Sequence, residues 1–374
     1  MVKVAYLAEN LGGYQDPTIS MAGVMHHSGH NVGNFAFWNA ARKLFDAETI
    51  CIPFGATRKA LPQDVDYVVI PAANFLNATA DLGWLADLIA DLDKPCIVVG
   101  LGAQSEREEQ IPDLKDGTVR FLREAAKRTP FLGLRGPFSE QVCAKYEIAN
   151  VKVLGCPSVF TNGDRKLAER IVAAWDQEIE KVAVHAASIK SHVMAAERYL
   201  FGILRTVPGS SYILQRPVEL MKLVRGLELS ETEQAYVEKV RQFLAPDLSM
   251  IKFSQMLRQT GMIPYSVDSW SFALQSYSHS LGTRIHGAML SIASYLPTIC
   301  ITHDTRTREL CSVLKVPNVN CNQVKATSSI RDIFAGVRMD AGVFEDNRST
   351  LAAGYKALLK EVGIGPSRYL SSRF

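Results

Sequence analysis

Short apolar runs alternate with helical patterns along most of the chain, and this alternation constrains the fold more than any other feature of the sequence. The runs are nearly continuous in Val, Ile, Leu and Ala, as in strands buried on both faces of a parallel sheet. The first set of predicted strands covers residues 2–8, 49–52, 67–70, 96–100, 131–134 and 151–154. Predicted helices separate them at residues 35–45, 82–92, 118–128 and 139–146. Such alternation predicts a parallel sheet with helices on both faces.

The same alternation restarts beyond residue 180. Further strands are predicted at residues 181–186, 211–214, 263–265, 278–281 and 298–301. Further helices are predicted at residues 195–204, 232–243, 253–260, 270–275 and 286–294. Residues 161–180 are interpreted as a crossover helix with a linker, and residues 349–362 as a final helix.

A chain of 374 residues is too long for one ordinary hydrophobic core, so about two domains are expected. We predict two doubly wound, Rossmann-like α/β domains, residues 1–165 and 176–345, that face each other across a cleft. Residues 346–374 would add a C-terminal helix. Because ligands of such folds sit at the carboxyl ends of the strands, polar residues at these ends are the candidates for a site.

The composition excludes several classes of protein. A formal charge of +3 without a concentrated basic stripe does not fit a nucleic-acid-binding protein. No apolar run approaches the ~18 residues of a transmembrane helix, and the N-terminus lacks the pattern of a signal peptide. We therefore expect a cytoplasmic protein. The seven cysteines are scattered and lack a C-x-x-C pair, which argues against a disulfide framework or a structural zinc site.

The segment "LGTRIHGAMLSIASYLPTICI", residues 281–301, places Arg284 and His286 side by side in an otherwise small and apolar run. A strand ends and a helix begins there, with Gly282 allowing a tight turn and Gly287 a close backbone approach. The free N–H groups of a helix start, together with an arginine fork, suit a phosphate or carboxylate. Histidine can exchange a proton near neutral pH. We interpret the pair as part of a site, although each residue alone is more often structural.

Arg135 is a second candidate, in "FLGLRGPFSEQVCAKY". It follows a predicted strand, and Pro137 suits the first turn of the next helix. Arg135 is expected to face the cleft. A structural salt bridge to Glu140 is an equally good interpretation.

The segment before the first helix is predicted to be a long loop, residues 10–30, of the kind that often forms a lid or a binding loop. Asn34 is a plausible N-cap and Gly33 a turn residue, while Asn31 would cap the helix or contact a ligand. His26, His27 and His30 lack an established metal-ligand pattern, and no carboxylate cluster accompanies them. We therefore predict a mobile substrate loop and no metal site.

Gly100, Gly102 and Gln104 follow the strand in "VVGLGAQSE". The rest of a dinucleotide-binding fingerprint is missing, so we interpret this segment as a strand-end loop that borders the cleft. His303 and Asp304 follow the last predicted strand and point to the same cleft.

Together these motifs resemble the polysaccharide pyruvyl transferase family. The resemblance covers most of the chain, from "NVGNFAFWNAARKLF" to about Val319, and is strongest in "SHSLGTRIHGAMLSIASYLPTICITHDTRTREL". The segments "KPCIVVGLGAQSE" and "FLGLRGPFSEQV" are similar to the family's glycine motif and its Arg-x-x-x-Ser helix start. Three segments depart from the family pattern: Asn34 replaces a usual Asp, "IPAANFLN" lacks a Gly-rich run, and "HDTRTREL" has an Arg where a Lys is common.

The resemblance implies a fold similar to the GT-B glycosyltransferases and a transferase that acts in cell-surface polysaccharide biosynthesis. Phosphoenolpyruvate would be the donor, and a sugar or glycan the acceptor, with a lipid carrier left open. The product would be a pyruvate ketal, with no cofactor. Peripheral attachment to the inner face of the membrane and the oligomeric state also stay open.

The resemblance also implies roles for individual residues. Arg284 and Arg135 would bind the donor from opposite sides of the cleft, with the first domain as the acceptor side and the second as the donor side. His286 would transfer the proton. The expected substrate-binding residues are Asn31, Gly33, Asn34, Asn74, Gly102, Gln104, Thr283 and Gly287.

Two other functions remain open. A nucleotide-sugar glycosyltransferase would share the fold and the cleft. A family member that only binds glycans would fit the altered "PAAN" segment, while the presence of Arg135, Arg284 and His286 together argues against it.

Overall fold

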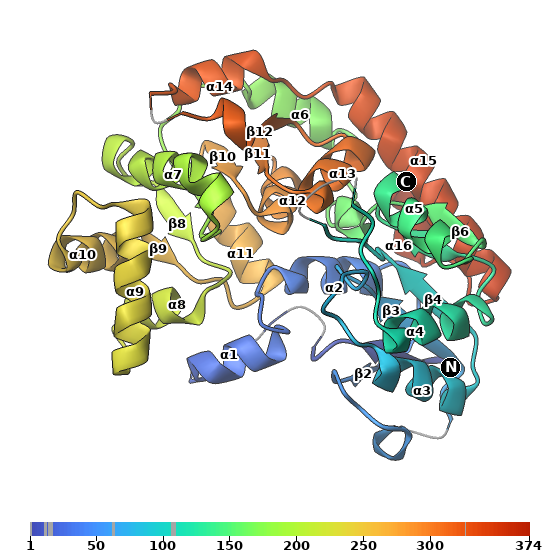
Figure 1. Ribbon diagram of the computed structural model, residues 1–374. Helices are drawn as coiled ribbons and strands as arrows, with labels where there is room; N and C mark the ends of the chain where they lie inside the picture. Colours follow the sequence, from blue (N-terminus) through green and yellow to red (C-terminus); the bar gives the residue numbers. More distant parts are fainter. Residues whose placement is uncertain (1, 11–12, 14–17, 62–63, 106–109, 326) are drawn as a thin grey trace.

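Two parallel sheets organise the chain, in a computed structural model that describes residues 2–10, 13, 18–61, 64–105, 110–325 and 327–374 (Figure 1). The first sheet has the order β2-β1-β3-β4, and a parallel β5-β6 pair extends it through a bridge between Leu101 and Leu134. These strands are β1 (Lys3–Leu7), β2 (Glu48–Ile52), β3 (Tyr67–Pro71), β4 (Cys96–Val99), β5 (Leu132–Leu134) and β6 (Val151–Val153). The first half of the predicted strand set is therefore confirmed.

The second sheet has six parallel strands in the order β12-β11-β10-β7-β8-β9. They are β7 (Val182–His185), β8 (Ser211–Ile213), β9 (Gly261–Met262), β10 (His279–Gly282), β11 (Thr298–Thr302) and β12 (Asn318–Asn320). The order in which the chain adds parallel strands therefore reverses between β7 and β10. In the first sheet it reverses between β1 and β3. Crevices for ligands form outside the strand ends at such points.

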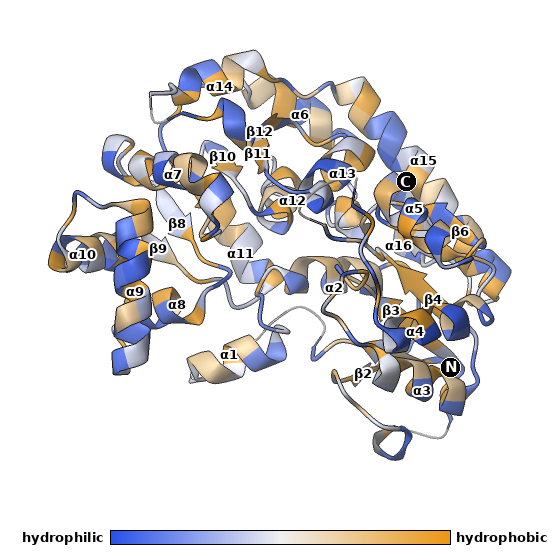
Figure 2. Cartoon of the chain, viewed as in Figure 1, coloured by the Kyte–Doolittle hydropathy of each residue, from blue (hydrophilic) through white to orange (hydrophobic). Residues whose placement is uncertain are grey.

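Helices cover both faces of the first sheet, because alternate strand residues enter two different cores. Val4 and Tyr6 pack in one core with α2 (Asn34–Arg42), and this core continues into the second half of the chain. Ala5 and Leu7 pack in the other core. The helices of the first half, besides α2, are α1 (Met21–His27), α3 (Gly83–Leu92), α4 (Asp116–Ala126) and α5 (Pro137–Lys145), with 3-10 turns η1 (Arg58–Ala60) and η2 (Pro157–Phe160). In Figure 2, β3 and β4 are coloured as hydrophobic, as expected for strands covered on both faces.

The second half carries its helices in the same alternating manner. They are α6 (Leu167–Ala174), α7 (Met194–Thr206), α8 (Val218–Val224), α9 (Glu231–Leu244), α10 (Met250–Thr260), α11 (Val267–Leu274), α12 (Ile285–Ala293), α13 (Thr305–Leu314) and α14 (Ile330–Gly336), with 3-10 turns η3 (Ser191–Val193) and η4 (Cys321–Gln323). The predicted linker at residues 161–180 contains α6. The two α/β units and the parallel sheets that the sequence predicted are both present.

The last part of the chain returns to the first half. Helix α15 (Ala341–Val362) begins eight residues before the predicted final helix, because the Asp340 side chain caps it by accepting from the Val343 N–H at 2.9 Å. Helix α16 (Arg368–Arg373) follows, and the Ser367 hydroxyl donates to the Lys43 carbonyl at 2.6 Å. The predicted boundary at residues 345/346 therefore falls inside α15.

Two predicted elements are wrong. The expected loop at residues 10–30 contains α1, which Ser20 caps by accepting from the Gly23 N–H at 3.0 Å; its residues 11–12 and 14–17 lie outside the described part. The strand expected at residues 263–265 is β9, two residues earlier. Gly261 pairs with Tyr212 there, where a side chain would meet Val224 at 2.4 Å, so only glycine fits.

No helix in the described part of the chain combines the length and apolar character that crossing a bilayer requires.

Candidate active site

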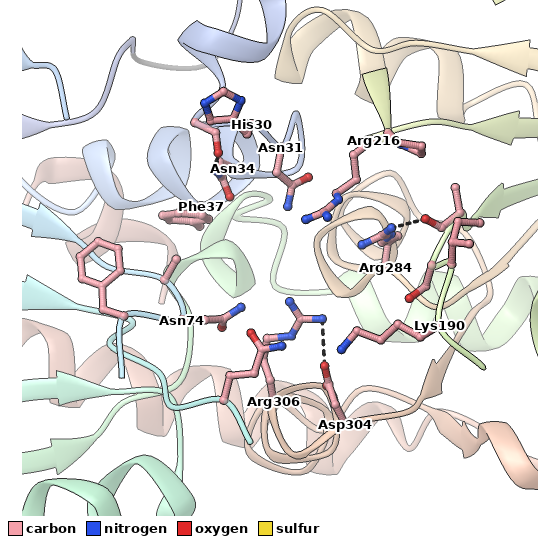
Figure 3. Close-up of a pocket in the computed structure, with 18 of the residues that line it drawn as sticks. His30, Asn31, Asn34, Phe37, Asn74, Lys190, Arg216, Arg284, Asp304 and Arg306 are labelled. Atoms are coloured by element: carbon pink, nitrogen blue, oxygen red, sulfur yellow. Dashed lines mark hydrogen bonds and ion pairs between the residues drawn. The ribbon is translucent and has the colours of Figure 1, made fainter. Parts of the chain in front are cut away.

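A cavity of about 590 Å³ lies between the two halves, at the carboxyl ends of strands from both sheets (Figure 3). The first half contributes Asn31 and Asn34 at the start of α2, Phe54 after β2, Asn74 after β3 and Gln104 after β4. The second half contributes residues that follow β7, β8, β10 and β11. These are Ala187, Ser188, Ile189, Lys190, Arg216, Pro217, Arg284, His303, Asp304 and Arg306. The cavity therefore occupies the place that the topology of the two sheets predicts.

The two walls of the cavity differ in chemistry. The cations Lys190, Arg216, Arg284 and Arg306 all come from the second half, and Asp304 is the one carboxylate among the described lining residues. The first half instead supplies amides, aromatic rings and the His30 imidazole, with the amides and rings coming from Asn31, Asn34, Asn74, Gln104, Phe37, Trp38, Phe54 and Phe75. Tyr236 on α9 adds one ring from the second half. A cationic wall suits anionic groups, and a wall of amides and rings suits a neutral, hydroxylated molecule.

Arg284 lies in the cationic wall, as the sequence predicted. It is the residue before α12, and its Nε donates to the Ala186 carbonyl at 3.3 Å, while Nη2 donates to the Ala187 carbonyl. Burial lowers the pKa of Arg284 to about 10, with the opposing influence of Glu197. Arg284 therefore keeps its charge at neutral pH, and its guanidinium is held in one orientation.

Glu197 on α7 organises the turn that holds Arg284, a role that was not predicted from the sequence. Its carboxylate is fully buried and accepts from the N–H groups of Ala187 and Ser188, each at 2.9 Å, and from the Thr283 hydroxyl at 2.7 Å. Burial raises the pKa of Glu197. Ala187 has a φ of 74°, a strained conformation for a residue with a side chain, and the bond to Glu197 helps to hold it. Thr283, which the resemblance assigned to substrate binding, is fully buried, and its hydroxyl bonds to this carboxylate.

Arg306 and Asp304 form a second fixed group at the start of α13. Arg306 Nη2 lies 3.3 Å from Asp304 Oδ2. Asp304 Oδ1 accepts from the Thr307 N–H at 2.8 Å, so the carboxylate also caps the helix. Burial raises the pKa of Asp304, but the charges of Arg306 and His303 and the bonds from Thr307 outweigh it and lower the pKa overall. Burial lowers the pKa of His303 to about 4, so that this imidazole is neutral near pH 7.

Arg135 does not face the cavity, contrary to the prediction. Its side chain is buried, with Nη1 donating to the Asn74 side-chain oxygen at 2.7 Å, and Gly102 leaves the space that it fills. The alternative salt bridge to Glu140 is also wrong, because Glu140 is exposed on α5. Arg135 therefore acts on the cavity through Asn74, which lines it.

His286 lies behind the wall of the cavity. It is 8% exposed, and its ring is 5.1 Å from the ring of Phe37, which lines the cavity. The guanidinium of Arg135 lies 5.8 Å from the same Phe37 ring. Burial, and then the charges of Arg135 and Arg306, lower the pKa of His286 well below its ordinary value. The imidazole is therefore neutral at physiological pH.

The comparison with protein families decides the assignment. The model of the polysaccharide pyruvyl transferase family matches residues 31–305. The chain belongs to this family. The matched range begins at Asn31 and ends just before Arg306, so it includes almost the whole lining of the cavity.

A search of curated proteins found no match to the sequence. Among solved structures, the chain is similar to S. aureus MnaA in complex with UDP, with 9% identity and a TM-score of 0.43, over 99% of this chain and 94% of that one. It is also similar to the Methanocaldococcus jannaschii UDP-GlcNAc 2-epimerase in complex with UDP-GlcNAc and UDP. That likeness has 10% identity and a TM-score of 0.41, over 95% of this chain and 100% of that one.

The remaining predicted site residues of this pyruvyl transferase family member divide into two groups. Asn31, Asn34, Asn74 and Gln104 line the cavity. Gly33, Gly102 and Gly287 instead provide space, since a Cβ atom would meet Gln215, Arg135 and His185 at 2.2, 2.6 and 2.4 Å. Gly33 is itself the N-cap of α2, in place of the predicted Asn34. Gly282 likewise ends β10 close to the His185 carbonyl, where a Cβ atom would meet that oxygen at 2.1 Å.

The sequence missed Lys190, Arg216 and Arg306 as lining residues. Each follows a strand within a few residues, and this position was the available signal. A position shortly after a strand did not by itself distinguish these three residues from other basic residues that do not line the cavity.

Proposed function

We propose that this protein transfers the pyruvyl unit of phosphoenolpyruvate to two hydroxyl groups of a sugar and forms a pyruvate ketal. The division of the cavity into two walls is the observation that supports this most. Phosphoenolpyruvate carries a phosphate and a carboxylate, and four cations of the second half converge on one region of the cavity. Arginine forks match both anions.

The acceptor sugar meets the opposite wall in this proposal. Its hydroxyl groups bond with the amides of Asn31, Asn34, Asn74 and Gln104, and its apolar face lies against the aromatic rings. No Lys, Arg, Asp or Glu of the first half is among the described lining residues, which favours a neutral sugar at the reacting end.

The proposed reaction balances without a cofactor. One hydroxyl oxygen attacks C2 of phosphoenolpyruvate as C3 gains a proton, and the bond between C2 and the phosphate oxygen breaks. The second hydroxyl oxygen then attacks C2 and closes the ketal. Of the two hydroxyl protons, one ends on the new methyl group and the other on the released phosphate. The cationic wall stabilises the charge that develops on the leaving phosphate.

His286 is the proposed proton-transfer group: burial keeps its imidazole neutral at physiological pH, so it can accept a hydroxyl proton and pass a proton on to C3. The Phe37 ring contacts both His286 and Arg135 and lines the cavity. A turn of this ring would bring both residues into contact with the substrates, and the proposal requires such a turn. Phe37 would then open the catalytic part of the cavity only when a substrate displaces it.

Phosphate release from phosphoenolpyruvate in the presence of candidate sugars tests the proposal. We expect Arg284→Ala to lower kcat/KM by roughly 100-fold or more, because it removes a donor to the developing charge. His286→Asn should lower kcat by a similar factor. The matched control is Arg123→Ala, an exposed arginine on α4, which should keep full activity. Wild-type turnover in His286→Asn would refute the proton-transfer role.

A thermal-shift comparison separates this proposal from the glycosyltransferase alternative. Phosphoenolpyruvate should raise the melting temperature of the wild-type protein and have little effect on Arg284→Ala. Stabilisation by UDP or GDP, with none by phosphoenolpyruvate, would instead favour a nucleotide-sugar donor.

A further inference from the structure

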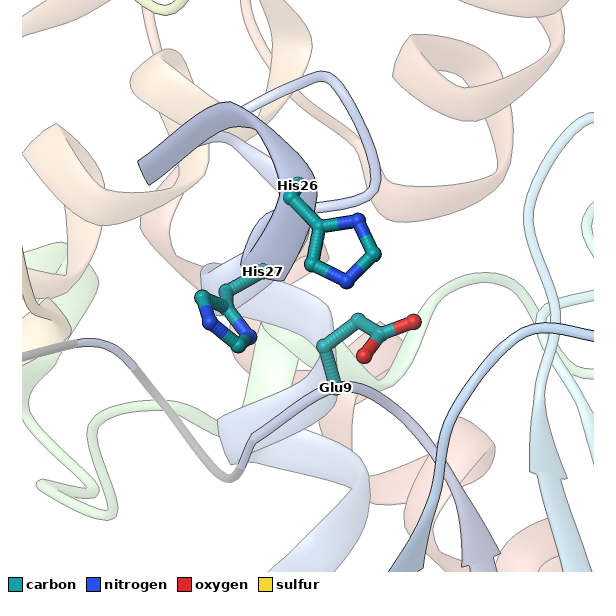
Figure 4. A group of neighbouring side chains, drawn as sticks. All are labelled: Glu9, His26 and His27. Atoms are coloured by element: carbon teal, nitrogen blue, oxygen red, sulfur yellow. The ribbon is translucent and has the colours of Figure 1, made fainter. Parts of the chain in front are cut away.

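Three side chains outside the cavity converge at the end of β1. Glu9 follows this strand, and His26 and His27 end α1 (Figure 4). Each residue can offer one ligand atom, a ring nitrogen from each histidine and a carboxylate oxygen from Glu9, and these atoms lie within 4.8 Å of one another. The sequence had argued against a metal here because no carboxylate accompanied the histidines. The fold supplies that carboxylate from Glu9, at the end of the preceding strand.

The geometry of the group is close to that of a metal site. Zinc binds histidine nitrogen and carboxylate oxygen at about 2.0–2.2 Å, so two of its tetrahedral ligand atoms lie roughly 3.5 Å apart. Rotations that move the side chains by about 1 Å would bring the three ligand atoms to this separation. His26 is exposed and free to make such a rotation, and its ring is already only 5.0 Å from that of His27.

A hydrogen bond already orients the Glu9 carboxylate. Glu9 Oε1 accepts from the Phe54 N–H at 3.0 Å. Bonds of this kind fix ligating carboxylates in metal sites. The Asn10 side chain also donates to the His27 carbonyl at 3.0 Å, so the strand end and the helix end are held together without a metal.

We propose that Glu9, His26 and His27 bind a divalent transition-metal ion of the Zn²⁺ type, with water in the fourth position. Two imidazoles and one carboxylate are the donors that zinc accepts, and they do not suit Ca²⁺ or Mg²⁺, which prefer oxygen ligands alone.

The bound ion would hold one wall of the cavity in place. Gly29 and His30 follow α1 directly and line the cavity, and the Asn34 amide donates to the Ser28 carbonyl at 2.8 Å. Phe54, whose N–H holds Glu9, lines the same wall. A metal that joins Glu9 to α1 would therefore connect the segment after α1 with the segment around Phe54, which both line this wall. It would act at a distance from the reacting groups.

Calorimetric titration of the full chain with Zn²⁺, after treatment with a chelator, tests the site. We expect one ion per chain, and at least ~10-fold weaker binding in His26→Ala and in Glu9→Gln, because even indirect partners of a metal contribute 10-fold or more. His192→Ala is the matched control, an exposed histidine on η3, and should bind as the wild type does. Mg²⁺ should not compete.

X-ray absorption and limited proteolysis provide independent readouts. The zinc spectrum should show nitrogen and oxygen ligands without sulfur, and Zn²⁺ should slow cleavage within residues 18–30 in the wild type but not in His26→Ala. Absence of binding, binding that survives in a His26→Ala/His27→Ala double variant, or sulfur ligation would each overturn the proposal. None of these measurements depends on the proposed transferase activity.

Discussion

His185 shows how deeply the framework behind the cavity is buried. It ends β7, its Nε2 lies 2.9 Å from the Ser291 hydroxyl, and its ring fills the space that Gly287 leaves open. Burial without a neighbouring anion lowers the pKa of His185 to about 3. The imidazole therefore stays neutral in the folded protein over most of the acid range.

This burial predicts a pH dependence of stability. An unfolded histidine takes up a proton near pH 6.5, whereas His185 in the folded protein does so near pH 3. As the pH falls between these values, the unfolded state binds the extra proton, so the free energy of unfolding falls by up to ~1.4 kcal/mol per pH unit from this residue. Urea unfolding at several pH values measures the slope.

The variant His185→Gln should make this slope shallower by about the same amount per pH unit. His192→Gln, the same substitution at an exposed histidine, is the matched control. An equal slope in His185→Gln and wild type would show that His185 is protonated, or solvated, in the folded state.

The residues of the site differed in how well the sequence alone could predict their positions. Arg284 was predicted because a cation stands out in a small, apolar, Gly-flanked run. The burial of Arg135 was not predicted, because its partner Asn74 and the space beside Gly102 come from other strands. Lys190 and Arg216 are isolated cations in loops, and only the folded chain brings them to one wall.

At the scale of elements, α5 is capped by the other half of the molecule. Glu309 on α13 accepts from the Ser139 N–H at 2.8 Å and from its hydroxyl at 3.1 Å. The same hydroxyl accepts from the Ala103 N–H at 2.9 Å, next to the cavity residue Gln104. This buried hydrogen-bond network thus joins α13, α5 and the loop after β4, and it fixes one edge of the cavity.

Glu309→Ala should lower the free energy of unfolding by roughly 1–3 kcal/mol, because it leaves a buried N–H without its acceptor. Chemical denaturation measures this change. Glu140→Ala provides the matched control, an exposed glutamate in the first turn of α5, and should cost less than about 1 kcal/mol. Equal losses in the two variants would contradict a specific role for Glu309.

The elements predicted best were the long ones with a clear period. Helices α7 and α9 and the apolar strands were found close to their true bounds. Helix α1 was missed because it is short and contains Gly23, so its pattern resembled a loop. Strand β9 was misplaced because contact with Val224 and pairing with Tyr212 select Gly261, and neither neighbour is near it in sequence.

At the scale of the whole molecule, the C-terminal segment joins the two halves. Leu370 on α16 is fully buried, and the Phe374 ring lies 5.0 Å from Phe160. The Arg348 guanidinium, on α15, lies 4.7 Å from the Phe374 ring. The alternation of strands and helices predicted two α/β units, but it held no signal for this return of the chain.

Leu370→Ala should lower the free energy of unfolding by about 2–5 kcal/mol, because it opens a cavity at this junction. Calorimetry should show one transition at a lower temperature, since a core shared by both halves makes them unfold together. Leu227→Ala, at an exposed leucine, should leave the transition near its wild-type position. Two separate transitions in the wild-type protein would show that the halves unfold independently.

The separate origin of the two cavity walls has a consequence for how this family can diversify. If the anion is held entirely by loops of the second sheet, those loops must stay constant while the donor does. Under the proposed function, the cavity-lining amides of the first half are under no such restriction, and exchanging them between relatives while Phe37 and Arg135 stay in place would transfer the preference for a sugar. Under the same proposed function, hybrid enzymes joined near α6 would inherit their acceptor from the parent that supplies the first sheet.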